Sequence, residues 1–378
     1  MTEQPTQNIN RVEVATSGDE WVSRAAEILS RGGIVAFPTE TVYGLAACPT
    51  VAGALDKLHA VKNRPSDKPY TVHLAHRRGM YEYVADPPWY AKVLARKGWP
   101  GPITLVVELT AAQDREARAR FGHDYDKLFS DSAIGLRCPD HPAASKLLSA
   151  AGGPVVAPSA NPSGEPPPTD ADQVCRYFDS EQVDLVVDGG PTRFRGSSTV
   201  VRVDRSGFEV LREGVIGADA VAKMSRFNVL FVCTGNTCRS PMAEGLCQRI
   251  LADELGVIPD ELEGMGISVV SAGTMGMSGF PASPEAVEAM RGMGADISHH
   301  RSRPLVPELV NRADAVFAMT PDHVEFVSGL VPGARDRVEL VEKDQGVSDP
   351  LGQPPAAYVA CAQRLEDAIR DRLRELFR

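Results

Sequence analysis

The stretch VCTGNTCRSPMAEG, Val232–Gly245, places two cysteines, an arginine and a serine–proline pair in one short segment of a chain of 378 residues. The apolar run NVLFV that leads into it is typical of a central strand in a parallel sheet. Ser240–Pro241 predicts the start of a helix, with the serine as its N-cap. The loop between strand and helix directs backbone N–H groups and a helix N-terminus toward one point, which predicts an anion-binding site.

The side chains of this loop predict phosphate chemistry at a cysteine. Arg239 offers the paired N–H groups that hold phosphate oxygens. We expect the positive field of the loop to lower the pKa of Cys233, so that its thiolate attacks phosphorus and forms a phosphocysteine that water hydrolyses. Asp349, in the segment GVSDPLG, is the candidate general acid for the leaving group, although an Asp–Pro pair is also common in ordinary turns. The Cys-x5-Arg spacing alone is weak evidence, and the strand and helix signals around it give it weight.

Length and composition indicate two globular domains. The chain is 43% hydrophobic and 24% charged, and a domain usually holds about 100–200 residues. It has no run of roughly 18 apolar residues that would span a membrane, and its polar N-terminus lacks the order of a signal peptide. Seven cysteines without a paired pattern fit reduced thiols, so we expect a cytoplasmic protein. The net charge of −10 argues against nucleic acid as the main ligand.

The order of predicted elements places both domains in the α/β class. Residues 11–217 predict a mixed α/β sheet domain, and residues 218–226 a linker. Strands and helices alternate over residues 227–378, which predicts a doubly wound parallel sheet. The prolines of NPSGEPPPT (Asn161–Thr169) exclude a helix or a central strand and predict a stiff surface loop. We expect the linker to be only a tether between halves that work independently.

The first domain lacks the familiar glycine-rich nucleotide motifs, but some of its polar residues suggest a site. Lys62 and Arg64 lie beside prolines, and cations fixed in a rigid segment suit a triphosphate; a solvated charged face is the plainer interpretation. Ser159 and Asn161 follow the strand-like run PVVAPS, and Thr39 follows IVAFPT. Polar residues at the C-terminal ends of strands are well placed to bind a ligand, although a capped turn would have the same sequence.

The second domain resembles the low-molecular-weight protein phosphatases. After the opening stretch, the segments SAGT (Ser271–Thr274), SRPL (Ser302–Leu305) and Asp349–Pro350 follow in the order found in that family. The resemblance implies that Cys233 is the nucleophile, Arg239 the phosphate ligand and Asp349 the general acid, with no cofactor. It also implies that the phosphate loop is supported by Asn236, Thr237 and Ser240.

Two departures from the tyrosine-directed phosphatases bear on the substrate. Thr237 stands where they usually carry a larger aliphatic residue, and Leu351–Gly352 stand where they carry aromatic residues, which leaves less surface for stacking a phenol ring. With the acidic excess of this half, these features resemble the protein-arginine phosphatase branch. We expect protein phosphoarginine as the first choice of substrate and phosphotyrosine as the second. Arsenate reductases share the Cys-x5-Arg loop but need further thiols to pass oxidation along. Only Cys247 and Cys361 follow Cys238, and both lie in predicted helices, which disfavours that activity.

The first domain resembles the YrdC-like threonylcarbamoyl-AMP synthases. The segments FPTETVYGLA, KNRPSDKPYTVHLA, WPGPITLVV, IGLRCPDHP, APSANPSGEPPPT and GSSTVVRV follow in the order found in that family. The resemblance implies that L-threonine, bicarbonate and ATP, accompanied by Mg²⁺, give threonylcarbamoyl-AMP for tRNA threonylcarbamoyladenosine, with a tRNA-modifying transferase complex as partner and no dedicated metal ligands. It implies that threonine contacts Thr39, His73 and Arg137, and that ATP contacts Lys62, Arg64, Ser159, Asn161, Ser198 and Arg212.

Two other interpretations come from different functional classes. The first domain could be an RNA-binding module without synthase activity, which the acidic balance of the chain disfavours. The second could bind phosphoproteins without turning them over, which the joint presence of Cys233, Arg239 and Asp349 disfavours. His73 also fits the role of a buried strand histidine that binds no ligand.

Overall fold

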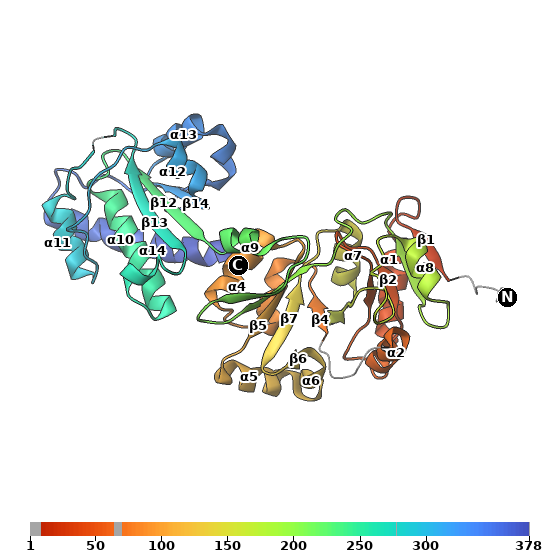
Figure 1. The fold of residues 1–378 in the computed structure, drawn as a ribbon. Helices are drawn as coiled ribbons and strands as arrows, with labels where there is room; N and C mark the ends of the chain where they lie inside the picture. Colours follow the sequence, from red (N-terminus) through yellow and green to blue (C-terminus); the bar gives the residue numbers. More distant parts are fainter. Residues whose placement is uncertain (1–8, 64–69, 277, 378) are drawn as a thin grey trace. The chain divides into compact units, whose positions relative to one another are not determined.

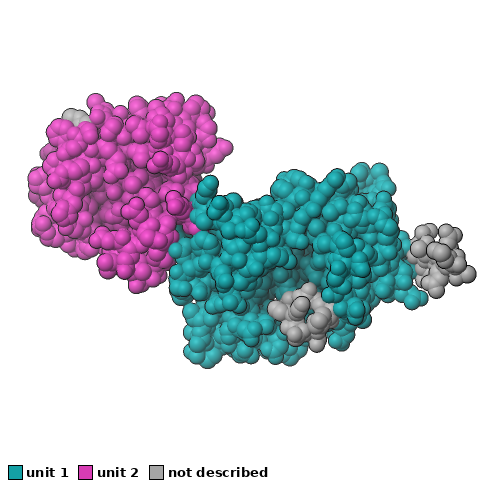
Figure 2. Space-filling model, in the orientation of Figure 1, with its two compact units in different colours: residues 1–224 teal, residues 225–378 magenta. Residues whose placement is uncertain are grey.

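A computed structural model describes residues 9–63, 70–276 and 278–377. The chain folds as two compact units, Met1–Met224 and Ser225–Arg378, which Figure 2 colours separately. Each unit has its own sheets and its own hydrophobic core. None of the helices in the described ranges is both long and apolar enough to cross a membrane.

Unit 1 contains two sheets, and the second has the mixed strand directions that the sequence predicts. The strand orders are β1-β9-β2-β3 and β11-β10-β5-β7-β4-β8, with β6 paired to β7. In the second sheet β10–β5 and β4–β7 are parallel pairs, whereas β5–β7 and β4–β8 are antiparallel. The strands are β1 (Arg11–Glu13), β2 (Val35–Phe37), β3 (Gly44–Ala46), β4 (Thr71–His73), β5 (Ile103–Glu108), β6 (Phe129–Ser130), β7 (Ala133–Arg137), β8 (Val155–Val156), β9 (Leu185–Asp188), β10 (Thr199–Val203) and β11 (Phe208–Arg212).

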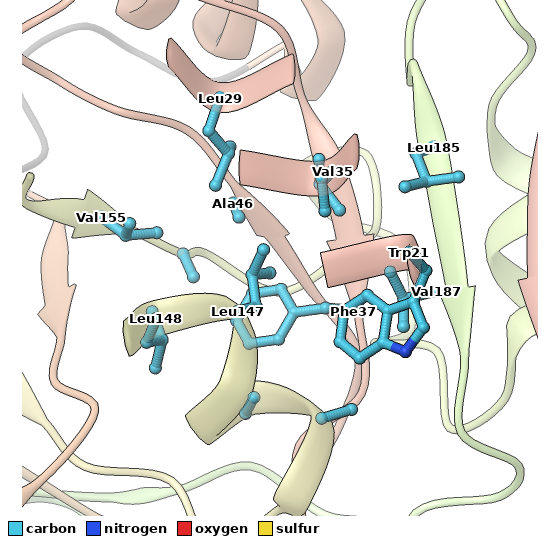
Figure 3. Close-up of a cluster of buried hydrophobic side chains, with 14 residues drawn as sticks. Trp21, Leu29, Val35, Phe37, Ala46, Leu147, Leu148, Val155, Leu185 and Val187 are labelled. Atoms are coloured by element: carbon cyan, nitrogen blue, oxygen red, sulfur yellow. The ribbon is translucent and has the colours of Figure 1, made fainter. Parts of the chain in front are cut away.

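Helices α1 and α7 close the core over the first sheet (Figure 3). Trp21, Ala25 and Leu29 recur at helical spacing along α1 and are all buried. They join Leu147 of α7 and Phe37 of β2 in one cluster, and burying each large apolar side chain contributes about 1.5–3 kcal/mol. The helices of unit 1 are α1 (Glu20–Ser30), α2 (Ala54–Lys62), η1 (Arg77–Gly79), α3 (Met80–Tyr83), α4 (Trp89–Gly98), α5 (Ala111–Phe121), η2 (Gly122–Asp124), α6 (Tyr125–Leu128), α7 (Pro142–Ala150), α8 (Ala171–Tyr177) and α9 (Ala218–Met224).

The segment 213–224 is folded onto unit 1. The N–H groups of Gly214 and Ile216 each donate to Thr199 Oγ1 at 3.1 Å, and the Thr199 hydroxyl donates to the Ile216 carbonyl at 2.6 Å. Helix α9 then packs against α4, with Val221 fully buried. Residues 218–224 of the predicted linker therefore form a helix that is folded as part of unit 1, while the independence of the two halves stays a prediction.

Unit 2 confirms the predicted doubly wound sheet. Its four strands are all parallel, in the order β13-β12-β14-β15. In β12, Leu230 and Val232 join Val310 of α12 and Val327 of α13 in one core, and the alternate residue Phe231 is also buried. Both faces of the strand are therefore covered, as in other parallel sheets.

Helices α10, α11 and α14 pack together in unit 2 (Figure 1). The strands are β12 (Phe227–Cys233), β13 (Ile267–Gly273), β14 (Ala315–Ala318) and β15 (Val338–Leu340). The helices are α10 (Arg239–Leu255), η3 (Pro259–Glu261), α11 (Pro284–Gly292), α12 (Pro307–Arg312), α13 (Pro321–Leu330), η4 (Pro332–Arg337) and α14 (Pro355–Phe377).

A truncation series tests the assignment of α9 to unit 1. We expect fragments 1–224 and 225–378 each to unfold cooperatively, and fragment 1–217 to be less stable than 1–224 by about 2 kcal/mol, because it loses the buried Val221 contact. Thermal unfolding followed by circular dichroism measures the difference. Equal stability of 1–217 and 1–224 would contradict the packing of α9 on α4.

Candidate active sites

The Cys233 sulfur faces the inside of the loop that follows β12. Cys233 is 3% exposed, and its Sγ accepts the Asn236 N–H at 3.2 Å and lies 2.9 Å from Ser240 Oγ. Helix α10 begins at Arg239 with Cys238 as its N-cap and no side-chain cap bond. The predicted N-cap role of Ser240 is therefore wrong. Ser240 lies two residues after the N-cap, inside the first turn of the helix, and its hydroxyl turns toward the sulfur.

Asn236 holds the loop in shape. It is fully buried and has a φ of 55°. This is the left-handed region of the backbone, which residues other than glycine rarely adopt. Its side-chain Nδ2 donates to Ser240 Oγ at 2.9 Å and to Ser271 Oγ at 2.7 Å. Its Oδ1 accepts the Arg303 N–H at 2.9 Å, and its main-chain carbonyl lies 2.9 Å from His300 Nε2. These contacts compensate for the strained backbone.

A second layer of buried polar groups supports Asn236. The Ser271 hydroxyl donates to Glu244 Oε2 at 2.5 Å, and His300 Nδ1 lies 3.8 Å from the same oxygen. Burial raises the pKa of the Glu244 carboxyl and lowers the pKa of the His300 imidazole. Sequence analysis quoted Ser271 within SAGT but missed Glu244 and His300. Glu244 in MAEG offers a signal, because it is an acid among the mostly apolar residues of the first two turns of α10.

Arg239 connects the loop to Asp349. The guanidinium is 4% exposed; its Nη1 donates to the Val347 carbonyl at 3.0 Å and its Nη2 contacts Asp349 Oδ2. Its Nε is buried and has no hydrogen-bond partner among the described residues. A buried unpaired donor is rare in proteins, and one on the phosphate loop suits an oxygen of a bound phosphoryl group. The Asp349 side chain is 40% exposed, so it can reach both a leaving group and water.

The ionisation of Cys233 differs from the expectation. Burial is the strongest influence on this thiol and raises its pKa. The hydrogen bonds from Ser240 and Asn236 and the charge of Arg239 act in the opposite direction. The prediction of a lowered pKa is therefore wrong for the thiol in this loop. The sequence reveals the donors around the sulfur, but not how completely the loop shields it from solvent.

An exposed aromatic residue lies close in sequence to residues that contact the phosphate loop, although the sequence around Asp349 predicts no aromatic surface there. Met275 and Ser283 both contact the phosphate loop, since the Met275 N–H donates to the Thr234 carbonyl at 3.0 Å and the Ser283 N–H to the Thr237 carbonyl at 2.8 Å. Phe280, which lies between them in the sequence, is 48% exposed and offers an aromatic surface that sequence analysis missed.

The two threonines of the phosphate loop differ in their partners, since Thr237 contacts a neighbour within the loop and Thr234 contacts a residue outside it. Thr237 is half-buried, with its Oγ1 at 3.7 Å from Cys238 Sγ. The hydroxyl of Thr234 lies 2.9 Å from His323 Nε2, a contact that the sequence did not predict. All seven cysteines are free thiols.

In unit 1, two strands bring the predicted threonine contacts together. His73 ends β4 and Arg137 ends β7, and the two residues are paired in register. Burial and the charge of Arg137 lower the pKa of His73 to about 3, so the imidazole is neutral at physiological pH. The Thr39 hydroxyl lies 2.9 Å from that of Thr41, which in turn accepts from Arg137 Nη2 at 2.5 Å. Thr39, His73 and Arg137 therefore belong to one buried polar cluster.

The predicted ATP contacts fall into two groups. Lys62, at the end of α2, is buried and its Nζ donates to the carbonyl of Asn161 at 2.6 Å and to the carbonyl of Ser159. Asn161 Oδ1 is buried without a partner in the part of the chain that the structure describes. A bridge between Gly44 and Ser159 joins this group to the segment after Thr39. Arg64 lies outside the described residues.

The second group consists of Ser198, which directly precedes β10, and Arg212, the last residue of β11. Arg212 Nη2 donates to the Ser198 carbonyl at 2.9 Å and lies 3.4 Å from its hydroxyl, which is 3.0 Å from Thr104 Oγ1. Burial and the charge of Arg137 lower the pKa of Arg212. Thr104 of β5 is paired in register with Arg137, and its hydroxyl contacts that of Ser198, so the structure brings the predicted threonine and ATP contacts near each other.

Known proteins match the two units of the chain separately. A family model of the Sua5/YciO/YrdC type, described as telomere recombination, matches residues 27–214, and one described as low molecular weight phosphotyrosine protein phosphatase matches residues 228–378. A threonylcarbamoyl-AMP synthase from Pyrococcus abyssi is 35% identical over 242 residues, 64% of this chain and 68% of that protein. A protein-arginine-phosphatase from Bacillus subtilis is 37% identical over 154 residues, 39% of this chain and 96% of that protein. The chain belongs to both families.

Two further relatives differ from those above in length or in the substrate class that their names give. A threonylcarbamoyl-AMP synthase from Bacillus subtilis is 38% identical over 187 residues, 49% of this chain, and the chain spans only 51% of that relative's length. A probable low molecular weight protein-tyrosine-phosphatase from Ralstonia solanacearum is 38% identical over 153 residues, 39% of this chain and 97% of that protein. The phosphatase family is thus established for unit 2, while arginine and tyrosine phosphatases resemble it equally.

The hydrogen bond from Ser240 to the sulfur leads to a prediction about pH. Because this bond lowers the pKa of Cys233, Ser240→Ala should raise that pKa by about half to one unit. The rate of inactivation by iodoacetate, measured against pH, should then have its midpoint at higher pH. Ser283→Ala is the matched control, since Ser283 contacts Cys238. An unchanged midpoint in Ser240→Ala would contradict the assigned contact.

Proposed function

We propose that this chain is a bifunctional enzyme. Its first unit condenses L-threonine, bicarbonate and ATP into threonylcarbamoyl-AMP and pyrophosphate, and its second unit hydrolyses phosphoarginine in proteins. The observation that supports the second activity most directly is the buried Cys233 sulfur, enclosed by the Asn236 N–H and the Ser240 hydroxyl. We assign both activities to the cytoplasm, where free thiols persist.

The phosphatase reaction follows from the geometry of the loop. Cys233 attacks the phosphorus as a thiolate, whose charge is balanced by Arg239, Asn236 and Ser240. An S–P bond forms as the P–N bond breaks, and Asp349 donates its proton to the departing guanidino nitrogen. Water then attacks the phosphocysteine, Asp349 accepts the proton of the water, and phosphate leaves as the thiolate is restored. Arg239 directs its unpaired Nε to the phosphoryl oxygens throughout.

Phosphoarginine is favoured by the residues around the phosphate. Thr237 carries a small hydroxyl that can hydrogen-bond a planar guanidinium or orient the attacking water, and Leu351 offers no ring for stacking. The arginine phosphatase from Bacillus subtilis is similar over 96% of its length. The net charge of the chain, −10, also suits a cationic leaving group.

Phosphotyrosine is the second candidate, and Phe280 favours it. This ring is 48% exposed and lies in the sequence between Met275 and Ser283, which both contact the phosphate loop, so it can contact a phenol ring in place of the aromatic residues missing after Asp349–Pro350.

A side-by-side assay separates the two substrates. We expect wild-type protein to hydrolyse a phosphoarginine protein faster than a phosphotyrosine peptide, and Thr237→Ile to shift the ratio of kcat/KM values toward phosphotyrosine by about tenfold. Phe280→Ala is the matched variant, because it should lower phosphotyrosine hydrolysis and leave phosphoarginine hydrolysis nearly unchanged. A ratio that does not respond to Thr237→Ile would refute the arginine assignment. Cys233→Ser should bind substrate without turnover.

The first unit offers separate contacts for each substrate of adenylate synthesis. We assign the threonine carboxylate and hydroxyl to the cluster of Arg137, His73 and Thr39. The carbamate formed from threonine and bicarbonate then attacks the α-phosphorus of ATP, and the buried cations offset the charge of the departing pyrophosphate. Mg²⁺ enters as part of the ATP substrate. The residues that we assign to ATP are Lys62, Arg64, Ser159, Asn161, Ser198 and Arg212.

The product suits a transferase that modifies tRNA adenosine, and we propose such a complex as the partner of unit 1. This partner would remove an unstable acyl-adenylate from the site before water hydrolyses it.

Pyrophosphate release tests the synthase directly. We expect release that requires threonine and bicarbonate together, and in Lys62→Ala a KM for ATP about tenfold or more higher, because the cation near the phosphates is lost. Lys57→Ala, on the same helix but paired with Asp184, is the control. Release without threonine would contradict the proposal, and salt-dependent tRNA binding without synthesis would support the RNA-binding alternative.

A further inference from the structure

Glu40 is a buried carboxylate whose position none of the roles assigned above explains. It lies in FPTETVYG between Thr39 and Thr41, and its side chain is 1% exposed. Its Oε1 lies 3.0 Å from Arg137 Nη2, and its Oε2 accepts the Asp140 N–H at 3.1 Å. Its main-chain carbonyl accepts the Phe194 N–H at 2.9 Å. The segment 137–140 therefore fixes the carboxylate of Glu40, and Phe194 fixes its backbone.

Arg137 is held along one edge by this carboxylate. Its Nη2 donates to Glu40 and to Thr41 Oγ1, at 3.0 Å and 2.5 Å. Its Nε is buried and has no partner among the residues described. Since buried donors are nearly always paired, this N–H is suited to an acceptor that the substrate brings. A carboxylate is the acceptor that fits a planar guanidinium best.

The contact with Glu40 also fixes Arg137 relative to its neighbours. Arg137 is paired in register with His73 across two parallel strands, and Thr41 links the guanidinium to the Thr39 hydroxyl at 2.9 Å. If the guanidinium of Arg137 could rotate, it would no longer keep its position relative to His73 and Thr39. An isosteric amide at position 40 could accept only one of its two hydrogen bonds, because its NH₂ group would face either Arg137 or the Asp140 N–H donor to donor.

We propose that Glu40 is a positioning residue for the amino-acid substrate, which orients Arg137 so that the unpaired Nε–H of its guanidinium binds the threonine carboxylate. The inference rests on the proposed function, in which Arg137 contacts threonine. It assigns Glu40 no contact with ATP, because its partners are Arg137 and the backbone of Asp140 and Phe194.

Kinetics of the full-length chain test this role. In Glu40→Gln we expect the KM for threonine to rise about tenfold or more while the KM for ATP stays within about twofold. Isothermal titration with L-threonine should show a matching loss of affinity. Thr41→Val, which removes the other acceptor of the same guanidinium nitrogen, should change threonine binding in the same direction by a smaller factor. Circular dichroism at the assay temperature verifies that each variant is folded.

The outcomes separate this inference from the function on which it rests. Unchanged threonine affinity in folded Glu40→Gln, or an equal rise in both KM values, would overturn the positioning role while synthesis by the wild type stands. If the wild type binds threonine but forms no adenylate, the proposed function fails. Loss of threonine binding in both variants would then still support the positioning role. A Glu40→Gln chain that does not fold leaves Thr41→Val to decide, and normal threonine binding there would refute the role.

Discussion

The left-handed backbone of Asn236 is the constraint on which the phosphatase unit depends. In this conformation its N–H donates to the Cys233 sulfur, and its side chain donates to Ser240, whose hydroxyl contacts the same sulfur. The conformation is strained for a residue with a side chain, and the strain is offset by contacts from β13 and from the SRPL segment. The buried Glu244 beneath Ser271 belongs to the same support. Buried polar residues beneath the loop therefore hold in place the residues that contact the sulfur.

In unit 1 the groups that are held in place by buried contacts are charged side chains. Lys62 is held by two backbone carbonyls, and Arg137 by Glu40 and Thr41, so each cation is fixed before a substrate arrives. Fixed charges act strongly on a reacting group because they need little reorganisation. A buried ion pair adds little to stability by itself, which makes orientation the better explanation for Glu40 and Arg137.

The sequence predicted the main buried strands of both units from their apolar runs, and it assigned Cys233, Arg239 and Asp349 to one site from the order of the motifs, but it did not predict the contact between Arg239 and Asp349. It failed where a partner lies far along the chain. Glu40 and Arg137 are separated by 97 positions and Ser271 and Glu244 by 27, and no local pattern links them. It also made Ser240 an N-cap, whereas the hydroxyl contacts the sulfur and Asn236 in the supporting role that the family resemblance implied. It gave the pKa of Cys233 the wrong direction, because that pKa depends on how completely the loop encloses the sulfur.

The claim that Cys233 bonds to phosphorus can be tested by trapping the intermediate. Asp349→Asn should slow hydrolysis of the phosphocysteine, because it removes the group that activates water. After rapid quenching of this variant with a phosphoarginine protein, mass spectrometry should find one phosphoryl group on the peptide that contains Cys233. Full turnover without any such adduct, or a phosphoryl group on another residue, would contradict the account.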